Sequence, residues 1–207
     1  MHWMPLNWHL PPKEKENLQK EAQKKPSRNR KKSNMYPANS AIRHPAFFNR
    51  YVEQVEPGKI SGLLEISVNL LEQDLSIISA IDSRFAYAPG KWSINTLIRH
   101  CIDAEMIFAF RALSIARLDP HPIRSFEENQ YAVEAEKEYD LHMLVQEFFH
   151  VRKATALLYK GFNEDWLNRT GITDNGEQIS LLSIGYIVIG HWLHHRKILK
   201  TRYGVDF

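Results

Sequence analysis

Four long segments with helical periodicity dominate this sequence and restrict what it can fold into. In each of them apolar residues recur every three or four positions over roughly 20 residues, which is the pattern of an amphipathic α-helix. The segments run from about Pro57 to Ile81, Ser93 to Arg117, Asp140 to Lys160 and Ser180 to Gly204. Because each helix has an apolar face to bury, a four-helix bundle is the simplest packing, and we predict an all-α fold.

Local signals mark the ends of these helices and the connections between them. Ser93 can cap the first turn of the second helix, and Gly204 is a stop signal for the fourth. The connection over about residues 118–139 is long for a bundle, which favours a functional or partner-contacting role. A turn at Asp174–Gly176 between short polar-apolar runs predicts a small hairpin before the fourth helix.

Residues 1–46 differ from the rest of the chain in charge and in apolar content. They carry ten Lys or Arg and three Glu, and they have few apolar anchors that could offset the entropy lost on ordering. We therefore predict a disordered basic tail over 1–46 and one bundle domain over 47–207. The tail could contact nucleic acid through "KKPSRNRKK", could be a solvated tail, or could precede a true start at Met35.

The remaining 161 residues set further limits on the class of protein. They carry 17 basic and 21 acidic residues, which gives no charge argument for nucleic-acid binding. No apolar run is long enough for a membrane span, and no apolar signal-peptide core is found near the start, so we expect a cytoplasmic protein. Cys101 is the single cysteine, so any metal must be held by His, Asp or Glu.

The fourth predicted helix contains three of the ten histidines within a stretch of five residues, in "GHWLHH". His191 and His195 are four residues apart, so they lie on one face, where two imidazoles can bind one ion. The same face carries Ile184, Ile187, Val188, Ile198 and Leu199, so the pair interrupts a core stripe. His194 lies to one side of this stripe, and we interpret it as a flanking residue.

The second predicted helix supplies a third histidine on an apolar stripe. His100 shares that stripe with Leu97, Cys101, Ala104, Ile107 and Phe108. His100, His191 and His195 could therefore converge inside the bundle and bind a divalent transition metal with an open, catalytic position. Asp103 could orient an imidazole from behind, or it could be a surface residue. The alternative for all three histidines is that they are ordinary buried side chains.

Several better-known kinds of site are excluded by the sequence. The H-E-x-x-H motif of zinc proteases fails because Trp192 follows the first histidine, and no P-loop, G-x-S-x-G or G-x-G-x-x-G motif occurs. Cys101 follows His100 directly and is interpreted as a packed thiol rather than a nucleophile.

Three blocks of the chain resemble the DinB/YfiT-like superfamily, which includes metal-dependent hydrolases. They are "YAPGKWSINTLIRHCIDAEMIFAFRALSIARLD", "SFEENQYA" and "GYIVIGHWLHHRKILKTRYG", and the likeness covers about Phe47 to Tyr203. The resemblance implies a four-helix bundle, commonly a homodimer, in which His100, His191 and His195 bind nickel or zinc. The chain departs from many relatives at Trp192, where they have Glu.

The resemblance also implies a class of reaction. Relatives with an assigned reaction are thiol S-transferases that use bacillithiol or mycothiol, together with a maleylpyruvate isomerase. We therefore expect a metal-dependent enzyme that transfers a low-molecular-weight thiol to an electrophile, with the segment from Arg124 to Tyr131 helping to recognise a small-molecule substrate. The alternatives are a metal-dependent hydrolase and a non-catalytic, metal-stabilised stress or binding protein.

Overall fold

The structure is a computed structural model that describes residues 42–135 and 140–207. The predicted tail therefore falls almost entirely outside the described residues. Its last part, residues 42–46, contacts the bundle, where Ile42 packs on the core. The Arg43 carbonyl oxygen accepts a hydrogen bond from the Ser180 N–H at 2.8 Å, and the Arg43 N–H donates to the Ser180 hydroxyl at 3.3 Å. These few residues thus lie against the start of the last helix.

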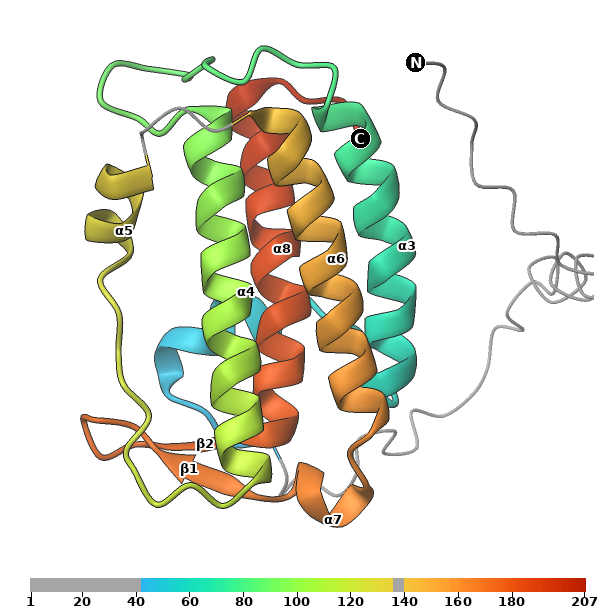
Figure 1. Cartoon of the computed structure of the whole chain (residues 1–207), viewed down its shortest axis with the longest axis vertical. Coiled ribbons are helices and arrows are strands. Elements are labelled where there is room, and N and C mark those ends of the chain that lie inside the picture. Colours follow the sequence, from blue (N-terminus) through green and yellow to red (C-terminus); the bar gives the residue numbers. More distant parts are fainter. Residues whose placement is uncertain (1–41, 136–139) are drawn as a thin grey trace, which may run out of the picture. The chain divides into compact units, whose positions relative to one another are not determined.

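Four long helices form the bundle, as the periodicity predicts (Figure 1). They are α3 (Ile60–Ile78), α4 (Ile94–Ala116), α6 (Leu141–Lys160) and α8 (Leu181–Tyr203). The predicted signals at the helix ends are confirmed as well. The Ser93 side chain accepts a hydrogen bond from the Thr96 N–H, and Gly204 ends α8 in a left-handed conformation with φ of 72°.

The helices do not alternate in direction around the bundle. Arg99 and Glu147, both near the start of their helices, form an ion pair, so α4 and α6 run the same way. Lys160 at the end of α6 pairs with Glu65 near the start of α3, which makes α3 and α6 antiparallel. In Figure 1 the long connection through α5 (Glu128–Ala135) returns the chain to the end from which α4 started.

Several short elements surround the bundle. They are η1 (Ala46–Phe48), α2 (Asn49–Val52), α7 (Glu164–Leu167) and the antiparallel strands β1 (Thr170–Ile172) and β2 (Gln178–Ser180). The strands confirm the predicted hairpin, with Gly171 opposite Ile179. Helix α5, like the other short helices, was not predicted. It lies in the long connection, which also makes an isolated bridge from Ile123 to Thr173.

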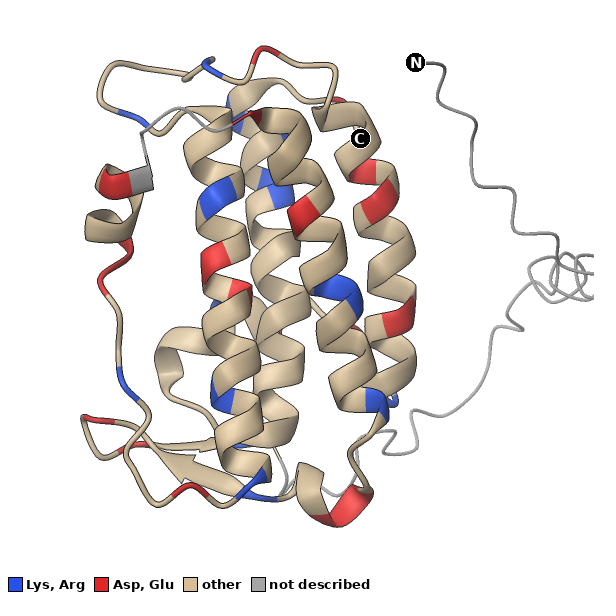
Figure 2. Ribbon diagram, in the orientation of Figure 1, with Lys and Arg blue, Asp and Glu red and all other residues tan. Residues whose placement is uncertain are grey.

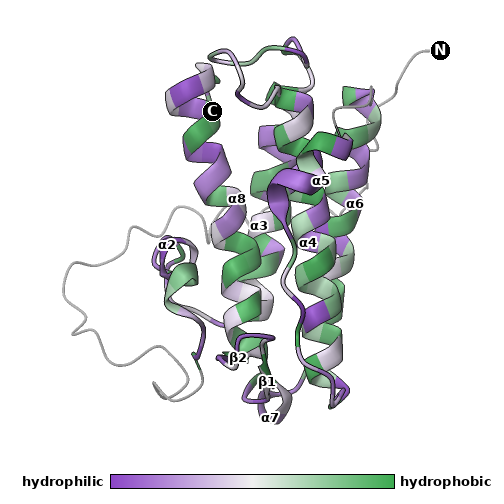
Figure 3. Cartoon of the chain, turned by 90° about the vertical axis from the view of Figure 1, so that its left-hand side faces the viewer, coloured by the Kyte–Doolittle hydropathy of each residue, from purple (hydrophilic) through white to green (hydrophobic). Residues whose placement is uncertain are grey.

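Helix α8 is buried on all sides over its first half. All residues from Leu181 to Trp192 are buried, because α2, α3, α4, α7 and β2 all pack against this helix. Figure 3 shows apolar and polar bands along the long helices, with α2 set beside α8. Gly190 permits this packing: a Cβ there would lie only 2.0 Å from the Tyr51 carbonyl oxygen.

The core consists of two hydrophobic clusters, one around the hairpin end of the bundle and one around its other end. Buried polar residues lie between them along the helices. Ser67 lies between Leu64 and Leu71 on α3, and Arg152 lies between Phe148 and Ala156 on α6. We name Ser67, Glu105 and Arg152 the ion-pair cluster. The Arg152 guanidinium donates to both Glu105 oxygens at 2.7–3.0 Å and to the Ser67 hydroxyl at 3.1 Å.

Charged residues of both signs are mixed along the long helices in the view of Figure 2. Within the described residues, no helix combines the length and the apolar character that a membrane crossing requires.

Candidate metal centre

The three predicted histidines come together inside the bundle. His100 of α4 and His191 and His195 of α8 are all buried. The Nε2 atom of His191 lies 3.2 Å from the Nε2 atoms of both His100 and His195. Their candidate ligand atoms all lie within 4.8 Å of one another, and this is the one such group of His, Cys, Asp or Glu found among the described residues. We name this group the histidine triad.

The local structure explains why the three rings meet. His191 and His195 are one turn apart on α8, so their rings lie next to each other, edge to face, with centroids 4.5 Å apart. Helix α4 packs against α8, and its buried face carries His100 to within 5.1 Å of the His191 ring and 4.9 Å of the His195 ring. The convergence therefore comes from two helix faces that the sequence already makes apolar.

Burial keeps the three imidazoles neutral. It lowers the pKa of His100 to about 4, with a smaller contribution from the positive charge that His194 can carry. Burial also lowers the pKa of His191 and His195 well below the usual value, and repulsion among the neighbouring imidazolium forms adds to this. Near neutral pH each ring therefore has a lone pair that can be donated to a metal ion.

The donor set fits a divalent transition metal. Two nitrogens bound tetrahedrally at about 2.1 Å from zinc are roughly 3.3–3.4 Å apart, close to the spacing of the Nε2 atoms here. The other nitrogen, Nδ1, is buried without a hydrogen-bond partner among the described residues in both His100 and His195. No described side chain therefore orients these two rings from behind, as carboxylates commonly do at metal sites.

Aromatic rings enclose the triad. The Tyr51 ring lies 5.2 Å from His191 and 5.4 Å from His194, and the Trp92 ring lies 5.0 Å from His100. Phe108 lies about two turns beyond His100 on α4, and its ring is 6.1 Å from the His191 ring. These apolar walls lower the local dielectric and strengthen electrostatic interactions within the site.

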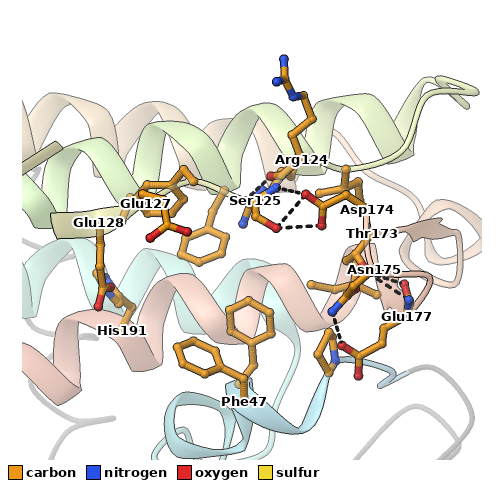
Figure 4. A pocket seen from close by; sticks show the side chains of 18 of the residues that line it. Phe47, Arg124, Ser125, Glu127, Glu128, Thr173, Asp174, Asn175, Glu177 and His191 are labelled. Carbon is orange, nitrogen blue, oxygen red and sulfur yellow. Dashed lines mark hydrogen bonds between the residues drawn. The ribbon is translucent and has the colours of Figure 1, made fainter. Parts of the chain in front are cut away.

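A cavity of about 370 Å³ opens from the triad at His100 and His191. Its walls come from η1 and α2, from α4, from the segment 123–129 and from the hairpin loop 173–177. Figure 4 shows Glu127 and Glu128 at the end of this cavity beside His191, whereas Asp174, Asn175 and Glu177 lie at the other end. The cavity is therefore lined by apolar rings in the middle and by polar groups towards both ends.

A second opening reaches the triad from the other side. A cavity of about 290 Å³ contacts His195 and is walled by Tyr87, Trp92 and Tyr203 from the α3–α4 loop and the end of α8. Asn129, near the start of α5, lines both cavities.

The other residues named from the sequence lie elsewhere. Asp103 accepts a hydrogen bond at 2.9 Å from Arg99, which also pairs with Glu147, and the structure does not bring it to the triad. Trp192 donates to Asp74 at 2.9 Å and packs on Phe148, so it faces the core of α3 and α6.

Two further residues behave as the sequence suggests. Cys101 is buried, and burial raises the pKa of its thiol well above the usual value. His194 is half-buried and lies beside the triad, with its ring 5.2 Å from His195.

Sequence reasoning missed Tyr51 and Arg111, which also line the first cavity. Tyr51 lies in a helix of four residues, too short for a periodic pattern. Arg111 gave a signal that could have been used, because it follows Ala104 and Phe108 on the stripe of His100, where a core residue is expected.

Together, the fold and the site define a four-helix-bundle protein with a buried histidine triad at the inner end of a cavity. The chain belongs to the DinB superfamily, whose sequence model matches residues 63–199, a span that includes all three histidines. This confirms the resemblance seen in the sequence. No curated protein matches the chain.

Solved structures share the fold at low sequence identity. YfiT from Bacillus subtilis, described as a probable metal-dependent hydrolase with an unusual four-helix bundle topology, is 18% identical with a TM-score of 0.58, covering 70% of this chain and 90% of YfiT. The mycothiol-dependent maleylpyruvate isomerase is 13% identical with a TM-score of 0.54, and the match covers 69% of this chain and 60% of the isomerase. A mutant of that isomerase gives the same score.

Proposed function

We propose that His100, His191 and His195 bind one divalent transition-metal ion, nickel or zinc, and that the protein is an enzyme. Its proposed reaction is the transfer of a low-molecular-weight thiol to an electrophile. The observation that carries this proposal is the convergence of three neutral imidazoles at the inner end of a cavity large enough for a small molecule.

Each part of the site has a role in this proposal. The imidazoles of the triad hold the ion, which supplies a positive charge that lowers the pKa of a thiol near it. Tyr51 and Phe108 form apolar walls of the cavity beside His191, where the reacting sulfur would lie. In the reaction the thiol loses its proton to solvent, and its sulfur forms a bond to the electrophilic carbon. A leaving group departs with its electron pair, or an acceptor double bond takes up a proton.

Elemental analysis of the purified protein tests the metal site. We expect close to one nickel or zinc ion per chain in the wild type and almost none in His191→Ala/His195→Ala. His194→Ala is the matched control, because this residue is in the same helix turn but outside the triad, and it should retain the metal. A wild-type protein that takes up no divalent metal would overturn the proposal.

A fluorescence assay tests the reaction. Metal-loaded protein is incubated with bacillithiol, mycothiol or glutathione and with monochlorobimane, in which the sulfur replaces chloride. We expect turnover with at least one thiol, and a loss of at least about 100-fold in His100→Ala, the size expected when a main electrostatic contribution is removed. Equal rates for the wild type and this variant would exclude transfer at this site.

Hydrolysis is a second candidate, and one observation favours it. Glu127 and Glu128 line the cavity beside His191, where a carboxylate could take a proton from an attacking water molecule (Figure 4). Ester and amide substrates distinguish the two reactions. Hydrolysis that depends on both the triad and Glu128, without any thiol transfer, would favour this candidate.

A non-catalytic metal site is distinguished by chelation. If the metal only holds the bundle together, its removal should unfold the protein. A catalytic site should lose activity while the helical circular dichroism signal is largely retained.

A homodimer remains a prediction, and the exposed face of α4 is its best candidate surface. Met106, Phe110 and Leu113 follow one another at helical spacing and are 48%, 66% and 38% exposed. Phe108 and Phe148, by contrast, are in the core. Light scattering gives the mass, and Phe110→Glu should convert a dimer that uses this face into a monomer.

A further inference from the structure

Arg111 is an exception among the buried arginines of the bundle. Arg152 donates to both oxygens of Glu105, and Arg99 donates to both oxygens of Glu147. Arg111 is as buried as Arg99, with 8% of its surface exposed, yet no carboxylate lies within ion-pair distance of it among the described residues. A buried charge normally has such a partner, because it has lost its hydration.

The guanidinium of Arg111 is only partly satisfied. One Nη atom donates to the Arg124 carbonyl oxygen at 2.5 Å, and the Nε atom is buried without a hydrogen-bond partner in the described part of the chain. Its faces lie near the rings of Phe108 and Phe126, at 5.3 and 5.7 Å from their centroids. These contacts hold the group in one position and leave donor capacity unused.

The negative charge of Asp174 interacts with the Arg111 guanidinium, but Asp174 accepts no hydrogen bond from it. Both carboxylate oxygens of Asp174 accept hydrogen bonds from Ser125, at 2.7–2.8 Å (Figure 4). Its negative charge raises the pKa of Arg111, while burial has the larger, opposite effect and lowers it. Asp174 therefore helps to keep the guanidinium charged from a distance.

The side chain of Arg111 lies where a ligand can reach it. It lines the 370 Å³ cavity that opens from the triad and also an adjoining cavity of about 540 Å³. The backbone of Arg111 lies about 16 Å further along α4 than that of His100 at 1.5 Å per residue. The guanidinium carbon is closer to the triad, because it lies 5.3 Å from the Phe108 ring, which is itself 6.1 Å from the His191 ring. A small molecule could therefore contact Arg111 at one end and approach the triad with the other, across the rings of Phe108 and Phe126.

We propose that Arg111 binds the carboxylate of the substrate, which is an apolar monocarboxylate with its reactive group at the far end. A planar guanidinium matches a carboxylate better than any other side chain, because two parallel N–H donors can face its two oxygens. Glu127 and Glu128 at the triad end disfavour a second carboxylate there (Figure 4). This inference rests on the proposed function in taking the cavity as the substrate site.

Calorimetry with metal-free protein tests the assignment without any catalysis. The full-length chain is stripped of metal, the chelator is removed, and 4-phenylbutyrate is compared with its neutral amide. We expect the wild type to bind the acid about 10- to 100-fold more tightly than the amide, as for a hydrogen-bonded charge. The ratio should fall to about 1 in Arg111→Gln and take an intermediate value in Arg111→Lys.

Two controls make the result decisive. Arg117→Gln removes the same charge from the end of the same helix, where Arg117 lies over the Trp166 ring outside the cavity, and it should keep the wild-type ratio. His191→Ala/His195→Ala should also keep the ratio, because the acid is held by Arg111 and not by the triad. If Arg111→Gln does not fold, the lysine variant still gives a measurable ratio.

The outcomes separate this inference from the proposed function. The assignment of Arg111 is overturned if the wild type shows no preference for the acid over the amide. It is also overturned if Arg111→Gln retains the preference or if Arg111→Lys leaves it unchanged. A preference that depends on Arg111 supports the assignment even if the chain takes up no metal and transfers no thiol. As a further check, an acid with a second carboxylate on the ring should bind metal-free protein more weakly than 4-phenylbutyrate.

Discussion

The ion-pair cluster and the histidine triad are both buried polar groups of the bundle, and they differ in how completely they are satisfied. In the ion-pair cluster, Arg152 donates to Glu105, Ser67 and the Val188 carbonyl oxygen, and Arg152 and Glu105 are 1% and 3% exposed. In the histidine triad, the Nδ1 atoms of His100 and His195 have no described partner, and two cavities reach the rings. The first group is closed and serves the fold, whereas the second is open and suited to binding.

The largest effect should come from breaking the ion-pair cluster. Arg152→Met leaves the Glu105 charge buried without a partner, which should lower the free energy of unfolding by roughly 3–5 kcal/mol. Replacing both residues, in Arg152→Met/Glu105→Leu, should recover most of this loss because no uncompensated charge remains. Urea unfolding measures both variants, and a double variant as unstable as the single one would contradict this account.

Metal loading should have the next largest effect, and it should act on the triad alone. At a free metal concentration 100 times the dissociation constant, the wild type should gain about 2.7 kcal/mol of stability. His191→Ala/His195→Ala should gain almost nothing from the same ion, whereas Arg152→Met, if it folds, should gain as much as the wild type. Thermal unfolding with and without nickel or zinc shows whether the two groups are independent in this way.

A smaller effect is expected where α2 closes over the triad. In Gly190→Ala the new methyl group would meet the Tyr51 backbone, so α2 must shift, at a cost of about 1–3 kcal/mol for overpacking. Gly62→Ala in α3 is the matched control, because nothing lies within 4 Å of its Cβ, and it should stabilise by at most about 1 kcal/mol. Equal stability of the two variants would show that α2 does not pack against α8 in solution.

The smallest effect concerns Cys101, which follows His100 directly in the sequence but is not part of the triad. Burial raises the pKa of its thiol, so the native protein should not react with a thiol reagent such as dithionitrobenzoate at pH 8, and it should react fully in urea. Cys101→Ser should leave metal content unchanged. Rapid labelling of the native protein would mean that α4 opens at the triad.

The sequence predicted the bundle closely because helical periodicity is a local property. Each long helix begins and ends within three residues of its predicted bounds, and the Ser93 cap and the Gly204 stop signal are both present. The short helices α2, α5 and α7 escaped prediction, since four to eight residues are too few to show a period. The charged residues Glu105 and Arg152 could have been found, as they occupy apolar stripes of α4 and α6.

By itself, then, the sequence determined which helices form and which faces they bury, and it placed His100, His191 and His195 on those faces. Only the tertiary structure decided which neighbours the buried polar groups have. It gave Arg152 a carboxylate from α4, paired Arg99 with Glu147 of α6, and left Arg111 and the triad facing a cavity. The physical reason is that hydrogen-bond partners and cavity walls come from residues far apart in the chain, whose positions depend on how the helices pack.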